Sequence, residues 1–90
     1  MANHKAAIKK ARQDEKRRLR NRGHRSRLAT AVKKFRRAVS DGDLDAAKGL
    51  LPSTLSLLDR SAKLGIIHDN GAARRKSRLT KALNRLAASA

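Results

Sequence analysis

Apolar residues recur along this chain at the three- and four-residue spacing of amphipathic helices, and they never alternate as in a β-strand. The first predicted helix starts at Asn3, which can act as its N-cap, and runs to about Ser40, where Ser-Asp-Gly-Asp ends it. Its apolar face is confined to its second half, which carries Leu28, Ala31, Val32, Phe35, Ala38 and Val39. We therefore expect only that half to pack in a core.

A second helix is predicted from its N-cap, Asp43, to Gly65, which suits the left-handed position that closes a helix. It has two adjacent apolar faces, which predicts two helical neighbours. The first face consists of Leu44, Ala47, Leu51, Leu55, Leu58 and Ala62, and the second of Leu50, Leu57 and Leu64. Pro52 removes one backbone hydrogen bond, so we expect it either to kink this helix or to split it in two.

The third helix is predicted to start between Ile67 and Gly71 and to run to about Ala87. It has an apolar face and an opposite basic face, formed respectively by Leu79, Leu83 and Leu86 and by Arg74, Arg78, Lys81 and Arg85. The predicted fold is all-α, with a bundle of three helices over residues 23–90 and a basic helical extension over residues 1–22. At 90 residues the chain forms a single domain at most.

The extension must protrude from that bundle. A first helix of about 37 residues is roughly 55 Å long, more than twice the length of a partner helix of about 15 residues. Gly23 lies near the junction and is a candidate hinge, although a single Gly is also tolerated inside a helix.

The chain is strongly basic, with 24 Lys or Arg, 7 Asp or Glu and a formal net charge of +17. Residues 1–37 hold 15 bases and two acids, residues 38–69 hold three bases and five Asp, and residues 70–90 hold six bases and no acid. This distribution predicts one side that faces a polyanion and another that faces solvent. Because Phe35 is the only aromatic residue, a duplex or folded nucleic acid held through its phosphates is favoured over a single strand.

No catalytic, cofactor or metal site is predicted, and we expect no enzyme activity and no small-molecule substrate. The chain has no Cys for a thiolate zinc site or a nucleophile, and His4, His24 and His68 lack metal-ligand spacing. A structural or phosphate-contacting role is expected for these histidines, with His4 counted among the phosphate contacts. Apolar runs are too short for a membrane span or a signal peptide, so we expect a cytoplasmic protein with no membrane partner.

Most of the predicted binding residues are cations of the first helix. A stripe at three- and four-residue spacing consists of Lys5, Lys9, Arg12, Lys16 and Arg20, and other sides carry Lys10, Arg17, Arg18 and Arg22. The segment is therefore predicted to be basic all round, as suits a slot between RNA segments. Charge and helix phase add Arg25, Arg27 and Lys34, and the basic face of the third helix adds Lys81. Because like charges repel at this spacing, we expect residues 1 to about 22 to be largely disordered without RNA.

Two stretches of the chain are distinctive. Residues 1–10 read Met-Ala-Asn-His-Lys-Ala-Ala-Ile-Lys-Lys, and residues 65–79 read Gly-Ile-Ile-His-Asp-Asn-Gly-Ala-Ala-Arg-Arg-Lys-Ser-Arg-Leu. With Leu58-Asp59-Arg60 and Ala62-Lys63 between them, the chain resembles the family of bacterial small-subunit ribosomal protein twenty over essentially its whole length.

That resemblance implies a three-helix bundle, a monomer within the ribosome, that binds 16S ribosomal RNA directly and early in small-subunit assembly. It also implies a bridge between the 5′ domain of that RNA and its long penultimate stem. By motif match, it implies RNA contact by Asn3, Lys5, Lys9 and Lys10 in the first stretch, and by His68, Asn70, Arg74, Arg75, Lys76 and Arg78 in the second.

Two other functions are compatible with the same distribution of charge. A DNA-compacting protein would need a dimer interface or a wedge residue, and Phe35 belongs to the apolar face of its helix instead. A basic inhibitor or chaperone of an acidic protein would stay with its partner after nuclease treatment. Competition between folded ribosomal RNA and duplex DNA separates the first of these from an RNA-binding protein.

Overall fold

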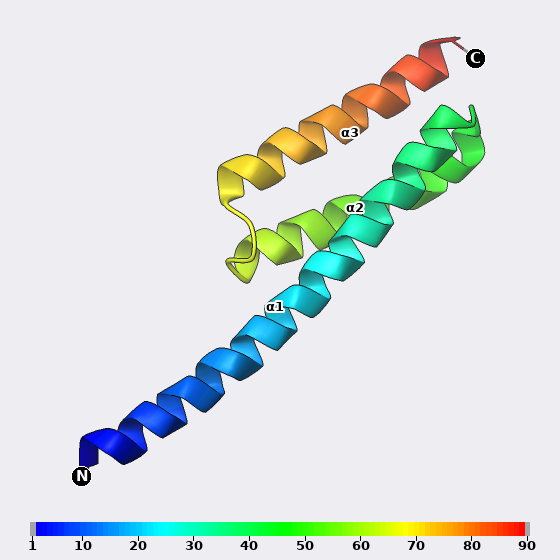
Figure 1. The fold of residues 1–90 in the computed structure, drawn as a ribbon. Helices are drawn as coiled ribbons and strands as arrows, with labels where there is room; N and C mark the ends of the chain where they lie inside the picture. The colour runs from blue at the N-terminus through cyan, green and yellow to red at the C-terminus, as the bar shows by residue number, and fades with distance from the viewer. Residues whose placement is uncertain (1, 90) are drawn as a thin grey trace.

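The structure, a computed structural model, describes residues 2–89, with side chains from His4 onward. It contains three helices, α1 (Ala2–Ser40), α2 (Leu44–Lys63) and α3 (Asp69–Ser89), and these residues include no strand. α2 runs back along the second half of α1, and α3 runs back along α2 (Figure 1). The predicted all-α fold with three helices is therefore confirmed.

The core lies where these three helices meet. Its buried side chains come from every helix and are Leu28, Phe35, Ala38, Ala47, Leu58 and Leu79. α2 packs against both neighbours, whereas α1 and α3 contact each other much less, as the two apolar faces of α2 predicted. Leu64 is an exception, because it lies beyond the end of α2 in the turn and is 53% exposed. Its assignment to the second apolar face of α2 is therefore wrong.

Both turns between helices depend on a glycine in the left-handed region. Gly42 and Gly65 each have a φ of 73°, where a side chain would be strained. At the end of α2, the Ile66 N–H donates to the Ser61 carbonyl at 2.9 Å and the Gly65 N–H donates to the Ala62 carbonyl at 3.0 Å, which is a Schellman motif. The predicted role of Gly65 is confirmed.

The turn after α1 repeats this pattern and leads directly into the next helix. The Asp43 N–H donates to the Ala38 carbonyl at 2.9 Å, while its Oδ1 accepts a hydrogen bond from the Ala46 N–H at 3.1 Å. Asp43 is thus the N-cap of α2, as predicted. The predicted N-cap Asn3 falls inside α1, and its side chain is not among those that the structure describes.

Pro52 lies inside α2 without splitting it, because Leu44–Lys63 is a single helix. The hydrogen bond that proline removes would have used the carbonyl of Lys48. Lys48, Gly49 and Pro52 are all exposed, so water can hydrate that carbonyl. Packing of the opposite side of α2 against two helices then keeps the helix continuous.

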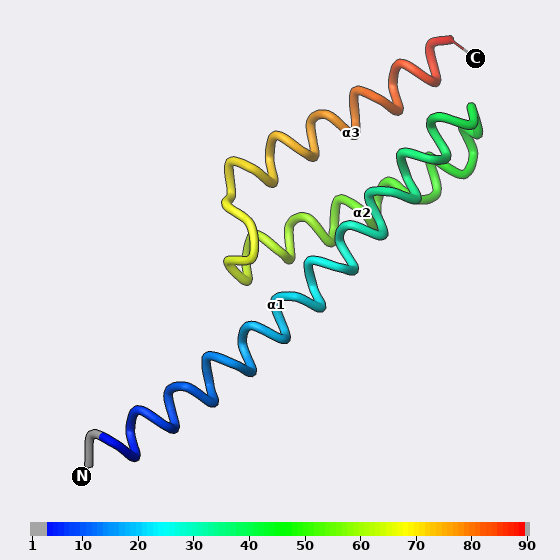
Figure 2. The backbone as a smooth tube through the Cα atoms, in the orientation of Figure 1, coloured from blue at the N-terminus to red at the C-terminus, as the bar shows by residue number. Residues whose placement is uncertain are grey.

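The first half of α1 extends away from the bundle. Every residue from His4 to Arg20 is exposed, and the first buried side chain of the helix is Leu28. The radius of gyration is 18.0 Å, compared with about 12 Å for a compact domain of this length. α1 continues through Gly23 as one uninterrupted helix, so the structure has no hinge there (Figure 2).

Candidate nucleic-acid interface

One row of cations follows almost the whole length of α1. Its first part, which we call the arm stripe, is the predicted set Lys5, Lys9, Arg12, Lys16 and Arg20. At 100° per residue these five side chains span about 80° of the helix surface, and Arg27 and Lys34 continue the same row. All seven are exposed. Over its length the row presents phosphate-binding groups along about 43 Å of helix.

Beside the bundle, this row borders α2. Arg27 and Lys34 line a shallow hollow together with Ser53, Thr54 and Leu57 of α2. The Thr54 hydroxyl is buried and donates to the Leu50 carbonyl at 2.9 Å, so it is already satisfied within α2. The binding capacity of this flank therefore rests on the two cations of α1.

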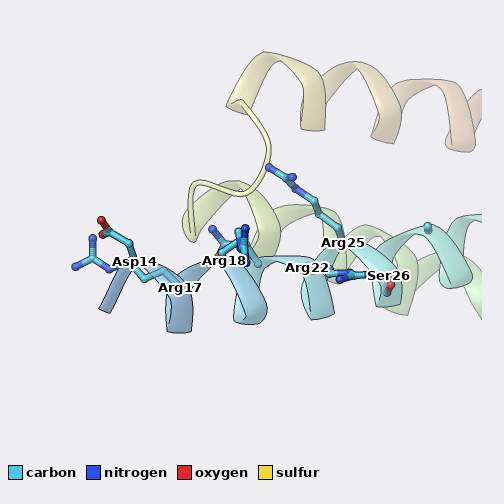
Figure 3. A pocket seen from close by; sticks show the side chains of 8 residues that line it. Asp14, Arg17, Arg18, Arg22, Arg25 and Ser26 are labelled. Carbon is cyan, nitrogen blue, oxygen red and sulfur yellow. The ribbon is translucent and has the colours of Figure 1, made fainter. Parts of the chain in front are cut away.

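A second row of cations lies on the other flank of α1. Figure 3 shows Arg17, Arg18, Arg22 and Arg25 along the helix, with Arg25 pointing toward the segment that joins α2 and α3. Arg18 lies 3.3 Å from Glu15, but both side chains are more than half exposed. An exposed ion pair of this kind contributes little to stability, so Arg18 can release the Glu15 carboxylate and bind a phosphate instead.

This second row leads into a groove between α1 and α3, which we call the α1–α3 groove. Its rims carry five cations, Arg25, Lys33 and Arg36 from α1 and Arg75 and Arg78 from α3. Its floor is apolar and consists of Leu28, Val32, Ile66, Ile67 and Leu79. The structure thus brings together predicted binding residues from distant parts of the chain, because Arg75 and Arg78 follow Arg25 by 50 and 53 positions.

Lys33 and Arg36 were not among the predicted binding residues. They follow Arg25 by eight and eleven positions, a spacing that places all three on one side of a helix. The sequence therefore indicated that Arg25, Lys33 and Arg36 lie on the same side of α1. It did not indicate that cations of α3 would form the opposite rim of a groove.

The predicted residues of α3 occupy different surfaces. Lys76 is half-buried, and its Nζ lies 2.8 Å from the Asp59 Oδ1 of α2, away from the groove. Arg74 and Lys81 are exposed and do not line the groove. The single cluster of bases in the second distinctive stretch is thus divided among a groove, an ion pair and an outer face.

His68 has a structural role at the start of α3. Its Nδ1 accepts a hydrogen bond from the Asn70 N–H at 3.1 Å, and its carbonyl accepts one from the Ala72 N–H at 3.0 Å. Its side chain therefore caps the helix, as Ser or Asp does elsewhere. Since Nδ1 is occupied, Nε2 is the ring atom of His68 that remains for a phosphate.

Within residues 4–20 one side of the helix carries no Lys or Arg, and Arg22 is the base of the predicted segment of residues 5–22 that lies on that side. Ile8, Ala11, Glu15 and Leu19 lie within about 80° of one another on the helix surface. Ile8 is 43% exposed and Leu19 is 56% exposed. Phosphate contact by residues 4–20 is therefore supported for the remaining sides only.

Over residues 2–89, no group of three His, Cys, Asp or Glu side chains is placed to hold a metal ion. None of the three helices contains an apolar stretch long enough to cross a membrane.

The fold and surface define a small helical protein whose extended, cationic α1 is far longer than its core requires. Residues 2–84 match the family described as Ribosomal protein S20. The small ribosomal subunit protein bS20 of Desulforapulum autotrophicum is 57% identical over 92% of this chain and 99% of its own length. The bS20 protein of Mycolicibacterium smegmatis is 51% identical over 96% of this chain and 100% of its own length. The bS20 protein of Aquifex aeolicus is 47% identical over 94% of this chain and 90% of its own length. The chain therefore belongs to the S20 family of ribosomal proteins of the small subunit.

Proposed function

We propose that this protein binds 16S ribosomal RNA directly and stabilises the packing of RNA segments during assembly of the small ribosomal subunit. The observation that carries the proposal is the arrangement of cations on α1, where two exposed rows flank the side that packs in the core. Phosphate groups repel one another where RNA helices converge, and a rod with cations on both flanks neutralises that repulsion. The role is structural and requires no catalytic group.

The two rows also support a bridge between two RNA segments. Beside the bundle, the row that borders α2 and the row that leads into the α1–α3 groove lie on opposite flanks of α1, so two RNA segments can be held at once. One segment lies on each flank, and the family resemblance suggests the 5′ domain and the long penultimate stem. Contacts of this kind recognise the shape of an RNA helix and its backbone more than its base sequence.

The chain acts as one domain with two parts. Residues 23–90 form the bundle that fixes the orientation of α1, and residues 1–22 are the extension that enters between RNA segments. The complete exposure of residues 4–20 and the burial that begins at Leu28 support this division. The protein works as a monomer bound to ribosomes, which in bacteria lie in the cytoplasm.

Nuclease footprinting of a 16S transcript tests this function. Addition of the protein should protect two separate regions, one in the 5′ domain and one in the penultimate stem. An excess of duplex DNA should not remove either footprint. Removal by an equal amount of DNA would favour a DNA-compacting protein, and retention of an acidic protein partner after nuclease treatment would favour the inhibitor.

A further inference from the structure

The α1–α3 groove differs from the rest of the cationic surface because its floor is apolar. Leu28, Ile66 and Leu79 are only 3–6% exposed, and Val32 and Ile67 are half-buried beside them. The groove remains open because α3 packs mainly on α2 and contacts α1 little. An apolar floor gains nothing from a phosphate group, so its ligand must also present an apolar surface.

The rims of the groove require that the same ligand be anionic at its edges. Four of the five rim cations are arginines, whose planar guanidinium groups pair with phosphate and stack on flat rings. Within residues 4–89, neither this part of the groove nor its continuation past Phe35 and Val39 is lined by an acidic side chain. The groove therefore matches a flat, weakly polar group with an anionic group on either side.

An unpaired nucleotide has this composition. Its base presents an apolar face once it leaves the helical stack, and its 5′ and 3′ phosphates continue the backbone on either side of the sugar that carries the base. A continuous duplex keeps its bases stacked inside, so its backbone would satisfy the rims and leave the floor uncovered. An acidic protein helix is the competing occupant. RNA is favoured because the groove continues the row of Arg18, Arg22 and Arg25 on the same flank of α1.

We propose that the α1–α3 groove holds one unpaired nucleotide of the RNA, with its base on the floor and its flanking phosphates on the two rims. This inference rests on the proposed function and adds a recognised base to it. The volume of the groove is about 680 Å³, within the range of about 300–1,000 Å³ that is typical of small-ligand sites. Arg78, which also lines the continuation of the groove, is placed to stack on that base.

Chemical probing of a 16S transcript with wild-type protein and an Ile67→Ser variant tests the inference. Hydroxyl radicals report on the backbone, and dimethyl sulfate and carbodiimide report on base atoms. Wild-type protein should protect one unpaired base, and the variant should leave that base reactive while the backbone footprint stays the same. The variant should also raise the Kd for the transcript about tenfold, because the base loses its apolar contact. Leu64→Ser is the matched control, since Leu64 is exposed and does not line the groove.

A second measurement is independent of the stability of the Ile67→Ser variant. A benzophenone amino acid introduced at position 67 in assembled small subunits should crosslink to the same nucleotide, and one at position 64 should not. A crosslink from position 67 to a protein, or equal base reactivity with both proteins, would overturn the inference. Wild-type protein without any footprint would overturn the proposed function as well, whereas a backbone footprint without a protected base would overturn the groove alone.

Discussion

Replacement of the five cations of the arm stripe by Gln should change how RNA binding depends on salt. All five side chains are exposed, and neither ion pair of residues 4–89 includes any of them. The substitutions therefore break no intramolecular contact in the bundle. Gln has nearly the same helix propensity as Lys and Arg, so α1 keeps its intrinsic tendency to be helical. What changes is the number of phosphates that the extension can neutralise.

The expected magnitude follows from counterion release. Each phosphate contact contributes about −0.7 to −0.9 to the slope of log K against log salt, so loss of five contacts makes the slope less negative by about 4. Between 0.1 and 0.4 M salt, the affinity of the wild-type protein should then fall about 250-fold more than that of the variant. If the two affinities converge at 1 M salt, the variant binds about 10⁴-fold more weakly at 0.1 M.

Filter binding or fluorescence anisotropy with a labelled 16S transcript, repeated at several salt concentrations, measures both slopes. The control variant replaces Lys48, Arg60 and Lys63 of α2 by Gln, which removes exposed cations that line neither flank of α1. Its slope should match that of the wild-type protein. An unchanged slope for the arm-stripe variant, or an equal change per residue in the control, would show that binding depends on total charge and not on the placement of these side chains.

Three further outcomes are expected. In the protein without RNA, amides of residues 4–20 should exchange with solvent at nearly unprotected rates because like charges destabilise this exposed helix, and strong protection before Gly23 would contradict this. Phe35→Ala should destabilise the bundle by about 3–5 kcal/mol in urea unfolding, since Phe35 is fully buried, and a loss under 1 kcal/mol would be inconsistent with that burial. Gly65→Ala should cost about 1 kcal/mol because of its positive φ, whereas Gly71→Ala, inside α3 with open space around it, should be neutral or stabilising.

The helices and their ends were largely predictable because they depend on residues close together in the chain. The spacing of Leu28, Val32 and Phe35 indicated which side of α1 is buried, and the structure buries that side. Gly65 and Asp43 were identified from the backbone geometry that each residue type favours. The effect of Pro52 was not predictable in the same way, because packing against two neighbours holds α2 together around the missing hydrogen bond.

The candidate site was predictable as a set of cations but not as a surface. Charge spacing identified the arm stripe, and helix phase alone would have revealed the apolar and acidic strip of Ile8, Glu15 and Leu19. The role of Lys76 could not be read from the sequence, because its partner Asp59 lies 17 residues away on another helix. Lys33 and Arg36 could not be predicted as groove residues, because the opposite rim of the groove belongs to α3.

The sequence by itself determined three helices, the two turns that join them, the side of each helix that is buried and an extension too polar to enter a core. These features follow from hydrogen bonding and side-chain spacing within one or two turns of helix. Only the tertiary structure decided that α1 and α3 are separated by a groove that has an apolar floor and arginines on both rims. The width of that groove depends on how both helices pack on α2, and no local pattern encodes the distance between two helices that contact each other little.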